Sequence, residues 1–322
     1  MNTSLAVSLL CAALVTTFTP GCAPPDADLD IEGAALDEDA VGGTTYVELG
    51  EFLQTEADRN AWLAVRQSLE KGFDEVCGDT FCEGDYSNLT PLDFECSVSS
   101  KLGKVRECAW TFAASTEAVD AATGKVAAAV PFFVCRITPQ AKAGELLAAL
   151  STDPLHAALP GLEKSIYDAI GDCFETPLDL EPPSPAAEGS FQDVTDTLEG
   201  DDVDAWYTML ASLRDDFEQR CSDSFCEGEF KNLAALRLRC SREAETGAIG
   251  SCAWSFAGSA SAPKKNGKLR IDRDSTTCDF NVAGTPGELA DALANPCAGP
   301  SPLLRPLPGS TGTLYDALVA CL

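Results

Sequence analysis

Apolar residues recur at helical spacing over residues 62–76 of this chain. They form one stripe: Trp62, Val65, Leu69, Phe73 and Val76. Thr55 precedes the stripe as a helix cap, and Asp58 lies in the first turn, where a carboxylate stabilises a helix. The pattern therefore predicts an amphipathic helix that begins after Thr55 and ends at Cys77, followed by a loop over residues 78–88.

Residues that alternate as they do in strands then predict two strands joined by a turn at Gly103. The alternating positions are Leu92, Phe94, Cys96 and Val98, followed by Arg106, Cys108, Trp110 and Phe112. A third strand is predicted over residues 126–137. Thr138 and Pro139 are expected to open a helix, and a last short helix holds Tyr167, Ile170 and Cys173. The predicted fold class is α+β, with a small antiparallel sheet of about three strands packed with helices.

The whole pattern occurs twice. Residues 77–112 align with residues 221–256 without a gap, and 16 of these 36 positions are identical. The second copy repeats the helical stripe with Trp206, Leu210, Leu213 and Phe217. Its third strand, 268–282, is more polar, and Thr285, Pro286 and Glu288 predict a helix with a capping box. The sequence thus predicts two tandem homologous, disulfide-rich domains over residues 46–176 and 201–322.

The N-terminal region has the features of an export signal. The apolar run Leu5–Val15 is too short to span a membrane as a helix, and it fits the core of a signal peptide over residues 1–21. Gly21, Cys22 and Ala23 then resemble a bacterial lipoprotein leader. That resemblance implies cleavage before Cys22 and acylation of its sulfur. The alternative is ordinary signal cleavage at the same bond, and either process places the protein in the bacterial cell envelope or outside the cell.

Twelve cysteines recur in matched positions of the two copies, and they predict a disulfide framework. They are Cys77, Cys82, Cys96, Cys108, Cys135 and Cys173 in the first copy, and Cys221, Cys226, Cys240, Cys252, Cys278 and Cys321 in the second. Zinc is disfavoured because short C-x2-C pairs are missing. Cys96 and Cys108 should pair across the predicted hairpin, whereas the sequence leaves the other pairings open. Cys297 has no counterpart in the first copy.

The formal net charge of −29 is concentrated partly outside the predicted domains. Residues 23–45 carry seven acids and no base, and residues 177–200 carry six acids and no base. We interpret residues 22–45 as a disordered acidic tether and 177–200 as an acidic, Pro-rich linker. The linear sequence has no basic run, so binding to nucleic acid is disfavoured, and membrane contact is expected only through a lipid anchor.

The acidic loops after the two predicted helices are the best local candidates for chemistry. They carry Asp79, Glu83 and Asp85 in the first copy, and Asp223, Glu227 and Glu229 in the second. Carboxylates in a loop pinned by cysteines are candidate calcium ligands, although their spacing differs from the EF-hand pattern. Turn-capping roles and an acid/base pair for glycoside hydrolysis are the alternatives. No other cofactor is indicated by the sequence.

Residues typical of other catalytic machinery are few. His156 is the only histidine and has no counterpart in the second copy, so an activity shared by both copies would not use it. The four tryptophans are expected in the cores. The sequence therefore favours a non-catalytic, exported, lipid-anchored surface protein with duplicated binding or structural modules, whose ligand it does not identify. The alternatives are a secreted carboxylate-dependent hydrolase and a calcium-stabilised envelope protein.

Overall fold

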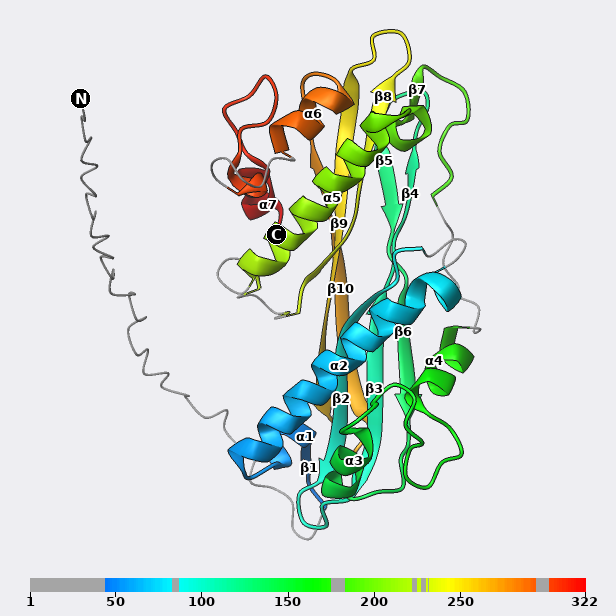
Figure 1. The fold of residues 1–322 in the computed structure, drawn as a ribbon, viewed down its shortest axis with the longest axis vertical. Coiled ribbons are helices and arrows are strands. Elements are labelled where there is room, and N and C mark those ends of the chain that lie inside the picture. The colour runs from blue at the N-terminus through cyan, green and yellow to red at the C-terminus, as the bar shows by residue number, and fades with distance from the viewer. Residues whose placement is uncertain are drawn as a thin grey trace, which may run out of the picture. The chain divides into compact units, whose positions relative to one another are not determined.

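The computed structural model describes residues 44–82, 87–174, 183–221, 225–226, 230, 232–293 and 301–322 (Figure 1). Residues 44–322 form one compact unit. We refer to residues 44–174 as the first half and to residues 183–322 as the second half. Each half holds a four-stranded antiparallel sheet, and helices pack against it. The chain is thus a mixed α/β protein, while its division into two separate domains stays a prediction.

The sheet of the first half has the strand order β1-β2-β3-β6, and β4 and β5 form a separate two-stranded ribbon. Its strands are β1 (Tyr46–Glu48), β2 (Thr90–Ser99), β3 (Val105–Ala113), β4 (Thr116–Val119), β5 (Val126–Ala129) and β6 (Phe132–Ile137). Its helices are α1 (Leu49–Phe52), α2 (Glu56–Thr80), α3 (Ala143–Leu150) and α4 (Ile166–Phe174). Thr55 caps α2 by accepting a hydrogen bond from the Asp58 backbone, as the sequence predicts.

The sheet of the second half has the strand order β7-β8-β9-β10. Its strands are β7 (Phe191–Asp193), β8 (Ala234–Glu243), β9 (Ile249–Pro263) and β10 (Leu269–Phe280). Its helices are the 3-10 helix η2 (Val194–Thr197), α5 (Asp201–Arg220), α6 (Pro286–Leu293), the 3-10 helix η4 (Pro302–Leu304) and α7 (Leu314–Cys321). β9 and β10 run continuously over the positions that β3 to β6 cover in the first half.

The cores of the two halves use matched aromatic residues. Phe73 of α2 is fully buried, and its ring centroid lies 5.8 Å from that of Trp110 and 4.9 Å from that of Phe112. In the second half Phe217 of α5 occupies the same place, 4.9 Å from Phe256. All four tryptophan side chains are buried, which confirms that they serve core packing.

Six disulfides connect the twelve repeated cysteines, three in each half. The pairs are Cys77–Cys82, Cys96–Cys108, Cys135–Cys173, Cys221–Cys226, Cys240–Cys252 and Cys278–Cys321. The prediction that Cys96 pairs with Cys108 is confirmed, because the two residues face each other directly in the β2–β3 register. The matched connectivity means that each half is cross-linked in the same places.

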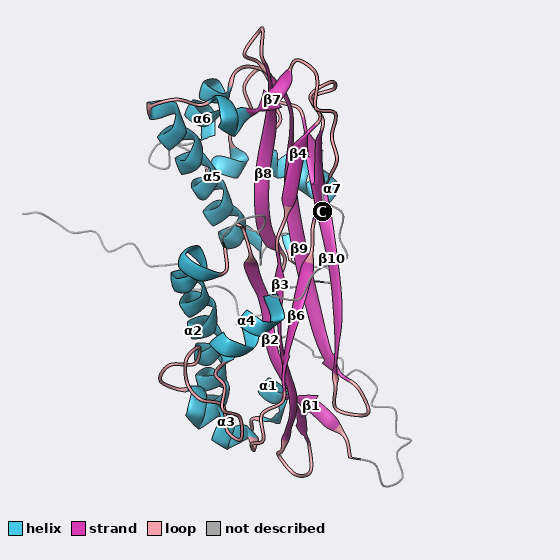
Figure 2. Cartoon of the chain, turned by 90° about the vertical axis from the view of Figure 1, so that its right-hand side faces the viewer, coloured by secondary structure: helices cyan, strands magenta, loops and turns pink. Residues whose placement is uncertain are grey.

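The two halves contact each other through reciprocal hairpins. Ser97 of β2 donates a hydrogen bond to the carbonyl of Gly267 in the β9–β10 turn, and Ser241 of β8 donates one to the carbonyl of Gly124 in the β4–β5 turn. Ser97 and Ser241 hold equivalent positions in the two copies, and so do the two glycines. The hairpin of each half therefore lies across the sheet of the other half (Figure 2).

Several predicted element boundaries need correction. Each sheet has four strands rather than about three, because the short strands β1 and β7 precede the long helices. β7 and η2 lie inside residues 177–200, which the sequence suggests are an extended linker. Helix α2 continues to Thr80 instead of ending at Cys77. Thr138 and Pro139 do not open α3, which begins at Ala143, whereas Thr285 and Glu288 do form the predicted capping box of α6.

A cleft between the two long helices

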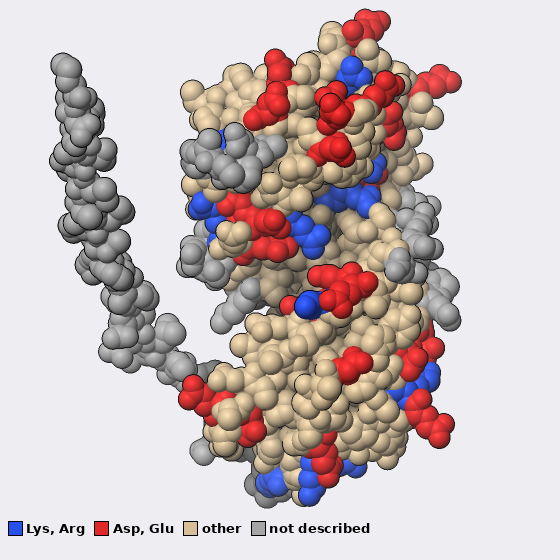
Figure 3. Space-filling view, viewed as in Figure 1, with Lys and Arg blue, Asp and Glu red and all other residues tan. Residues whose placement is uncertain are grey.

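A cleft with a volume of about 530 Å³ lies beside helix α5, and a neighbouring hollow of about 390 Å³ extends it toward β2. Asp74, Arg214 and Glu218 line both spaces, so we treat them as one inter-helix cleft. Figure 3 shows the hollow between the two long helices, with acidic and basic side chains gathered on its walls. The inter-helix cleft brings charged groups of both halves together, with Glu70 and Asp74 from α2 and Arg214 and Glu218 from α5.

The floor of the cleft is apolar because it belongs to the second sheet. Leu236 and Leu238 of β8 and the edge of Trp254 line it, and all three side chains are buried. Tyr207 of α5 lies at the margin and is 55% exposed. Its ring offers a contact for the apolar part of a ligand.

Carboxylates dominate the walls. Glu70 and Asp74 lie one helical turn apart on α2, and Glu218 faces them from α5. Partial burial raises the pKa of Asp74, and the charge of Glu218 raises it further, while Arg214 acts in the opposite direction. Burial also raises the pKa of Glu70; Arg66 opposes this rise, and Asp74 adds a smaller contribution to it. Burial is thus the main cause of both shifts, and it favours the protonated form of each carboxyl.

The two arginines of the cleft are already paired with acids. Arg214 donates a hydrogen bond of 3.1 Å to Glu218 on the same helix. Arg237 of β8 crosses to the first half, where its guanidinium lies 3.5 Å from the fully buried carboxylate of Glu117. It also donates a 2.7 Å hydrogen bond to the hydroxyl of Ser87. Both cations are thus held in place, and among the described residues Glu70 and Asp74 form no ion pair, although Arg66 and Arg214 are near enough to lower the pKa values of these two acids.

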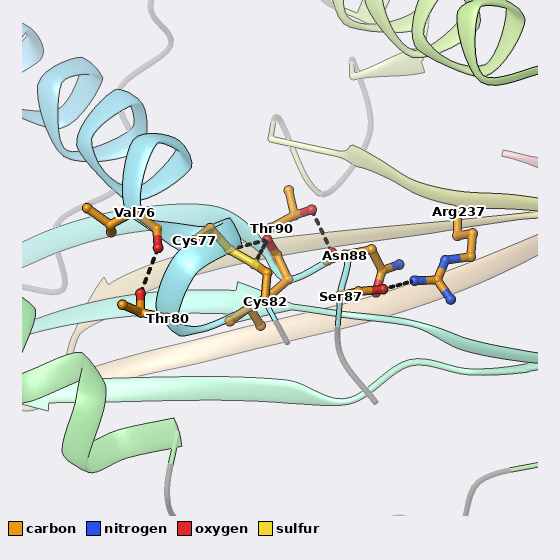
Figure 4. Close-up of a disulfide and its surroundings, with 9 residues drawn as sticks. Val76, Cys77, Thr80, Cys82, Ser87, Asn88, Thr90 and Arg237 are labelled. Carbon is orange, nitrogen blue, oxygen red and sulfur yellow. Dashed lines mark hydrogen bonds between the residues drawn. A yellow bond between two sulfur atoms is a disulfide. The ribbon is translucent and has the colours of Figure 1, made fainter. Parts of the chain in front are cut away.

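Figure 4 shows the described residues on either side of the first acidic loop. The Cys77–Cys82 disulfide closes the last turn of α2, and the backbone N–H of Cys82 donates to the carbonyl of Cys77. Beyond the loop, Ser87 contacts Arg237, and Asn88 bonds to Ser115 through a 2.7 Å hydrogen bond. The loop is therefore fixed at both ends, one of them on a residue that lines the cleft.

The predicted metal and lipid sites fall on residues that the structure leaves undescribed. Glu83, Asp85, Asp223, Glu227 and Glu229 lie outside the described residues, as do Cys22 and Cys297, and the side chain of Asp79 is not described either. Among the described residues, no group of three or more His, Cys, Asp or Glu is placed to hold a metal ion. The calcium site and the loop carboxylate pair therefore stay predictions.

His156 has a structural position. Its backbone N–H donates a 3.2 Å hydrogen bond to Asp153, and its ring lies 5.0 Å from the ring of Tyr167. It is exposed on the loop after α3 and is not among the residues that line the cleft. That the single histidine takes no part in a shared activity stays a prediction.

One feature of the sequence relates to the cleft, namely an acidic residue repeated at the same helix position in both copies. Asp74 and Glu218 occupy equivalent positions of the two copies, and both lie on the polar side of a long helix. A repeated acid on a helix is ordinarily a solvated residue. Asp74 and Glu218 face the same cleft only because the two helices that carry them lie on either side of it.

Comparisons with known proteins do not assign the chain to a family. Within the part of the chain that the structure describes, no helix has the length and apolar character needed to cross a membrane. No family model, no curated protein and no solved structure matches the chain. The disulfides, the charge and the inter-helix cleft are therefore the features that bear on function.

Proposed function

We propose that this chain is an exported, lipid-anchored binding protein whose inter-helix cleft takes a cationic ligand with an apolar part. The single observation that carries the proposal is the acidic wall formed by Glu70, Asp74 and Glu218 above a floor of leucine and tryptophan. A lysine-containing peptide or an alkyl amine has this combination of a positive charge and apolar carbon atoms. The six disulfides support an oxidising compartment outside the cytoplasm.

Because the pKa values of Glu70 and Asp74 are raised, the affinity of the cleft for a cation should depend on pH. Because Glu70 and Asp74 bind protons more readily than ordinary carboxyls, a bound cation has to displace those protons. Affinity for a cation should therefore rise as the pH increases above the ordinary carboxyl range of about 4, and protons should be released on binding. A ligand held only by the apolar floor would show no such dependence.

A short peptide with alternating lysine and leucine residues is a suitable probe, and the same peptide with glutamate in place of lysine is its control. Trp254 lines the cleft, so its fluorescence can report binding. Asp74→Asn combined with Glu218→Gln should weaken binding of the lysine peptide about tenfold, because each partly exposed ion pair contributes up to about 1 kcal/mol.

The matched control is Glu75→Gln combined with Asp291→Asn. Both of these acids are exposed and absent from the lining of the cleft, so the net charge changes equally while the cleft is preserved. We expect this variant to bind the lysine peptide as the unmodified chain does. Equal affinity for the lysine and glutamate peptides, or equal loss in both variants, would contradict the proposed cleft.

A further inference from the structure

Eight basic side chains gather at one end of the described unit, although the chain as a whole is strongly acidic. They are Lys101, Lys104, Arg106, Lys142, Lys264, Lys265, Lys268 and Arg270, out of 22 Lys and Arg in the sequence. All eight are exposed. We call them the basic end. They come from the β2–β3 turn, the start of β3, the start of α3 and the β9–β10 hairpin.

Specific contacts bring these distant segments together. Lys104 and Lys142 form an isolated β-bridge, so the start of α3 lies beside the β2–β3 turn. Gly267 in the hairpin turn has a φ of +80°, and a Cβ there would lie 2.6 Å from carbons of Tyr46 and Arg106. The β9–β10 hairpin of the second half therefore packs directly against the start of β3 in the first half. Figure 2 shows both turns at the lower end, next to β1.

The charge at this end is only weakly neutralised. Arg270 forms an ion pair of 2.9 Å with Asp272, and the other seven side chains form no ion pair with any described residue. At physiological ionic strength the screening length is about 8 Å, so a partner would respond to these local charges more than to the acids at the opposite end of the described unit.

An exposed apolar residue lies among the bases. Leu102 occupies the tip of the β2–β3 turn, between Lys101 and Lys104, and it is 67% exposed, more than any other large apolar side chain of the described residues. A leucine flanked by lysines matches the interface of an anionic bilayer, where the apolar side chain enters the acyl region and the ammonium groups meet the phosphates. A nucleic acid would offer that leucine no comparable environment.

The opposite end serves as an internal comparison. The equivalent of the β2–β3 turn in the second half carries Glu243, Glu245 and Thr246, so both the lysine and the exposed leucine are replaced. The equivalent β4–β5 turn retains a single base, Lys125. Because the same fold forms with acidic turns, the bases and Leu102 are not required for folding. Their presence at one end alone needs another explanation.

We propose that the basic end docks on an anionic phospholipid surface, with Leu102 inserted between headgroups. Thr44, where the chain enters the described unit, lines the same hollow as Leu102, Lys104 and Arg106. The segment that follows Cys22 in the sequence therefore joins the described unit at this end. The inference does not depend on what the inter-helix cleft binds.

The test uses the mature chain with Cys22→Ser, which removes the lipid anchor, and measures co-sedimentation with vesicles. We expect binding to vesicles of phosphatidylglycerol and phosphatidylcholine in equal parts, none to phosphatidylcholine alone, and release at 1 M salt. Lys264→Gln combined with Lys265→Gln should weaken binding about 30-fold, since each lysine near an anionic bilayer contributes about a fivefold effect. Leu102→Ser should also weaken binding at unchanged stability.

The matched control is Lys71→Gln combined with Lys125→Gln, which removes the same charge from exposed positions outside the basic end. It should bind the mixed vesicles within about twofold of the unmodified chain. Equal loss in the two double variants, or equal binding to both kinds of vesicle, would overturn the proposal. If the chain shows no preference for the mixed vesicles, binding to a DNA duplex would also overturn the proposal. Displacement of the chain from the vesicles by dissolved glycerol phosphate would do so under the same condition.

Discussion

The buried carboxyl of Glu95 should make the stability of the first half depend on pH. Glu95 of β2 is only 5% exposed, and one of its oxygens accepts hydrogen bonds of 3.2 Å from the backbone of Leu49 and 2.9 Å from that of Cys96. Arg66 lies 3.9 Å from its other oxygen but forms a closer, 2.6 Å contact with Asp93. Burial therefore prevails and raises the pKa of Glu95 to about 8.

The direction of the effect follows from proton binding in the two states. Between pH 4.5 and about 8, the folded protein keeps the proton of Glu95 while the unfolded chain has lost it. Stability is then highest at low pH and falls as the pH rises through this window. At ~1.4 kcal/mol for each pH unit, the total loss is about 4–5 kcal/mol. Glu95→Gln keeps an oxygen acceptor without a titrating proton and should abolish this part of the slope.

The assay is urea unfolding under non-reducing conditions, followed by tryptophan fluorescence at pH 5, 6, 7 and 8. The unfolding free energy of the unmodified chain should fall relative to Glu95→Gln by about 4 kcal/mol across the series. Glu75→Gln, at an exposed position of α2, should keep the original slope. If the curves of the unmodified chain and Glu95→Gln run parallel, the carboxyl is ionised in the folded protein and the argument from burial is refuted.

Three further changes test the packing of the first half and its contact with the second. Replacing Cys96 and Cys108 together by alanine should lower the unfolding free energy by about 2–4 kcal/mol, measured by urea unfolding, because a 12-residue loop loses its cross-link. Phe73→Ala should cost about 3–5 kcal/mol in the same assay, since the side chain is fully buried among aromatic rings. Gly267→Ala should lower the melting temperature, because it combines a left-handed φ with a close approach to Tyr46, whereas Ala substitution at Gly144, which has open space, should leave it nearly unchanged.

The sequence predicted those features that depend on local periodicity. The alternation around Cys96 and Cys108 determined a strand register in which the two residues face each other, and the structure has that register. Prediction from the sequence failed where tertiary contacts compete with local sequence signals. Thr138 and Pro139 form a plausible helix start, but residues 141 and 143 form backbone hydrogen bonds with Val105 and Gly103, so α3 begins only at Ala143.

The short strands, and the sites that combine distant residues, could not be predicted from local sequence patterns for other reasons. The strands β1 and β7 have three residues each, which is too short for an alternating pattern to be recognised. The inter-helix cleft and the basic end combine residues from turns and helices far apart in the sequence. Lys104 and Lys265, for example, belong to different halves, so no run of bases appears in the linear chain.

The reciprocal hairpins have a consequence for how the two ends could diverge. The matched contacts of Ser97 with Gly267 and of Ser241 with Gly124 are those of a symmetric dimer, in which each surface of one subunit meets the same surface of the other. In a dimer of identical chains, every substitution appears twice, at both ends of the assembly. Here the two partners belong to one polypeptide, so one end could become basic while the other stayed acidic. Covalent fusion thus permits the two ends to carry opposite charge, which the two ends of a symmetric dimer cannot do.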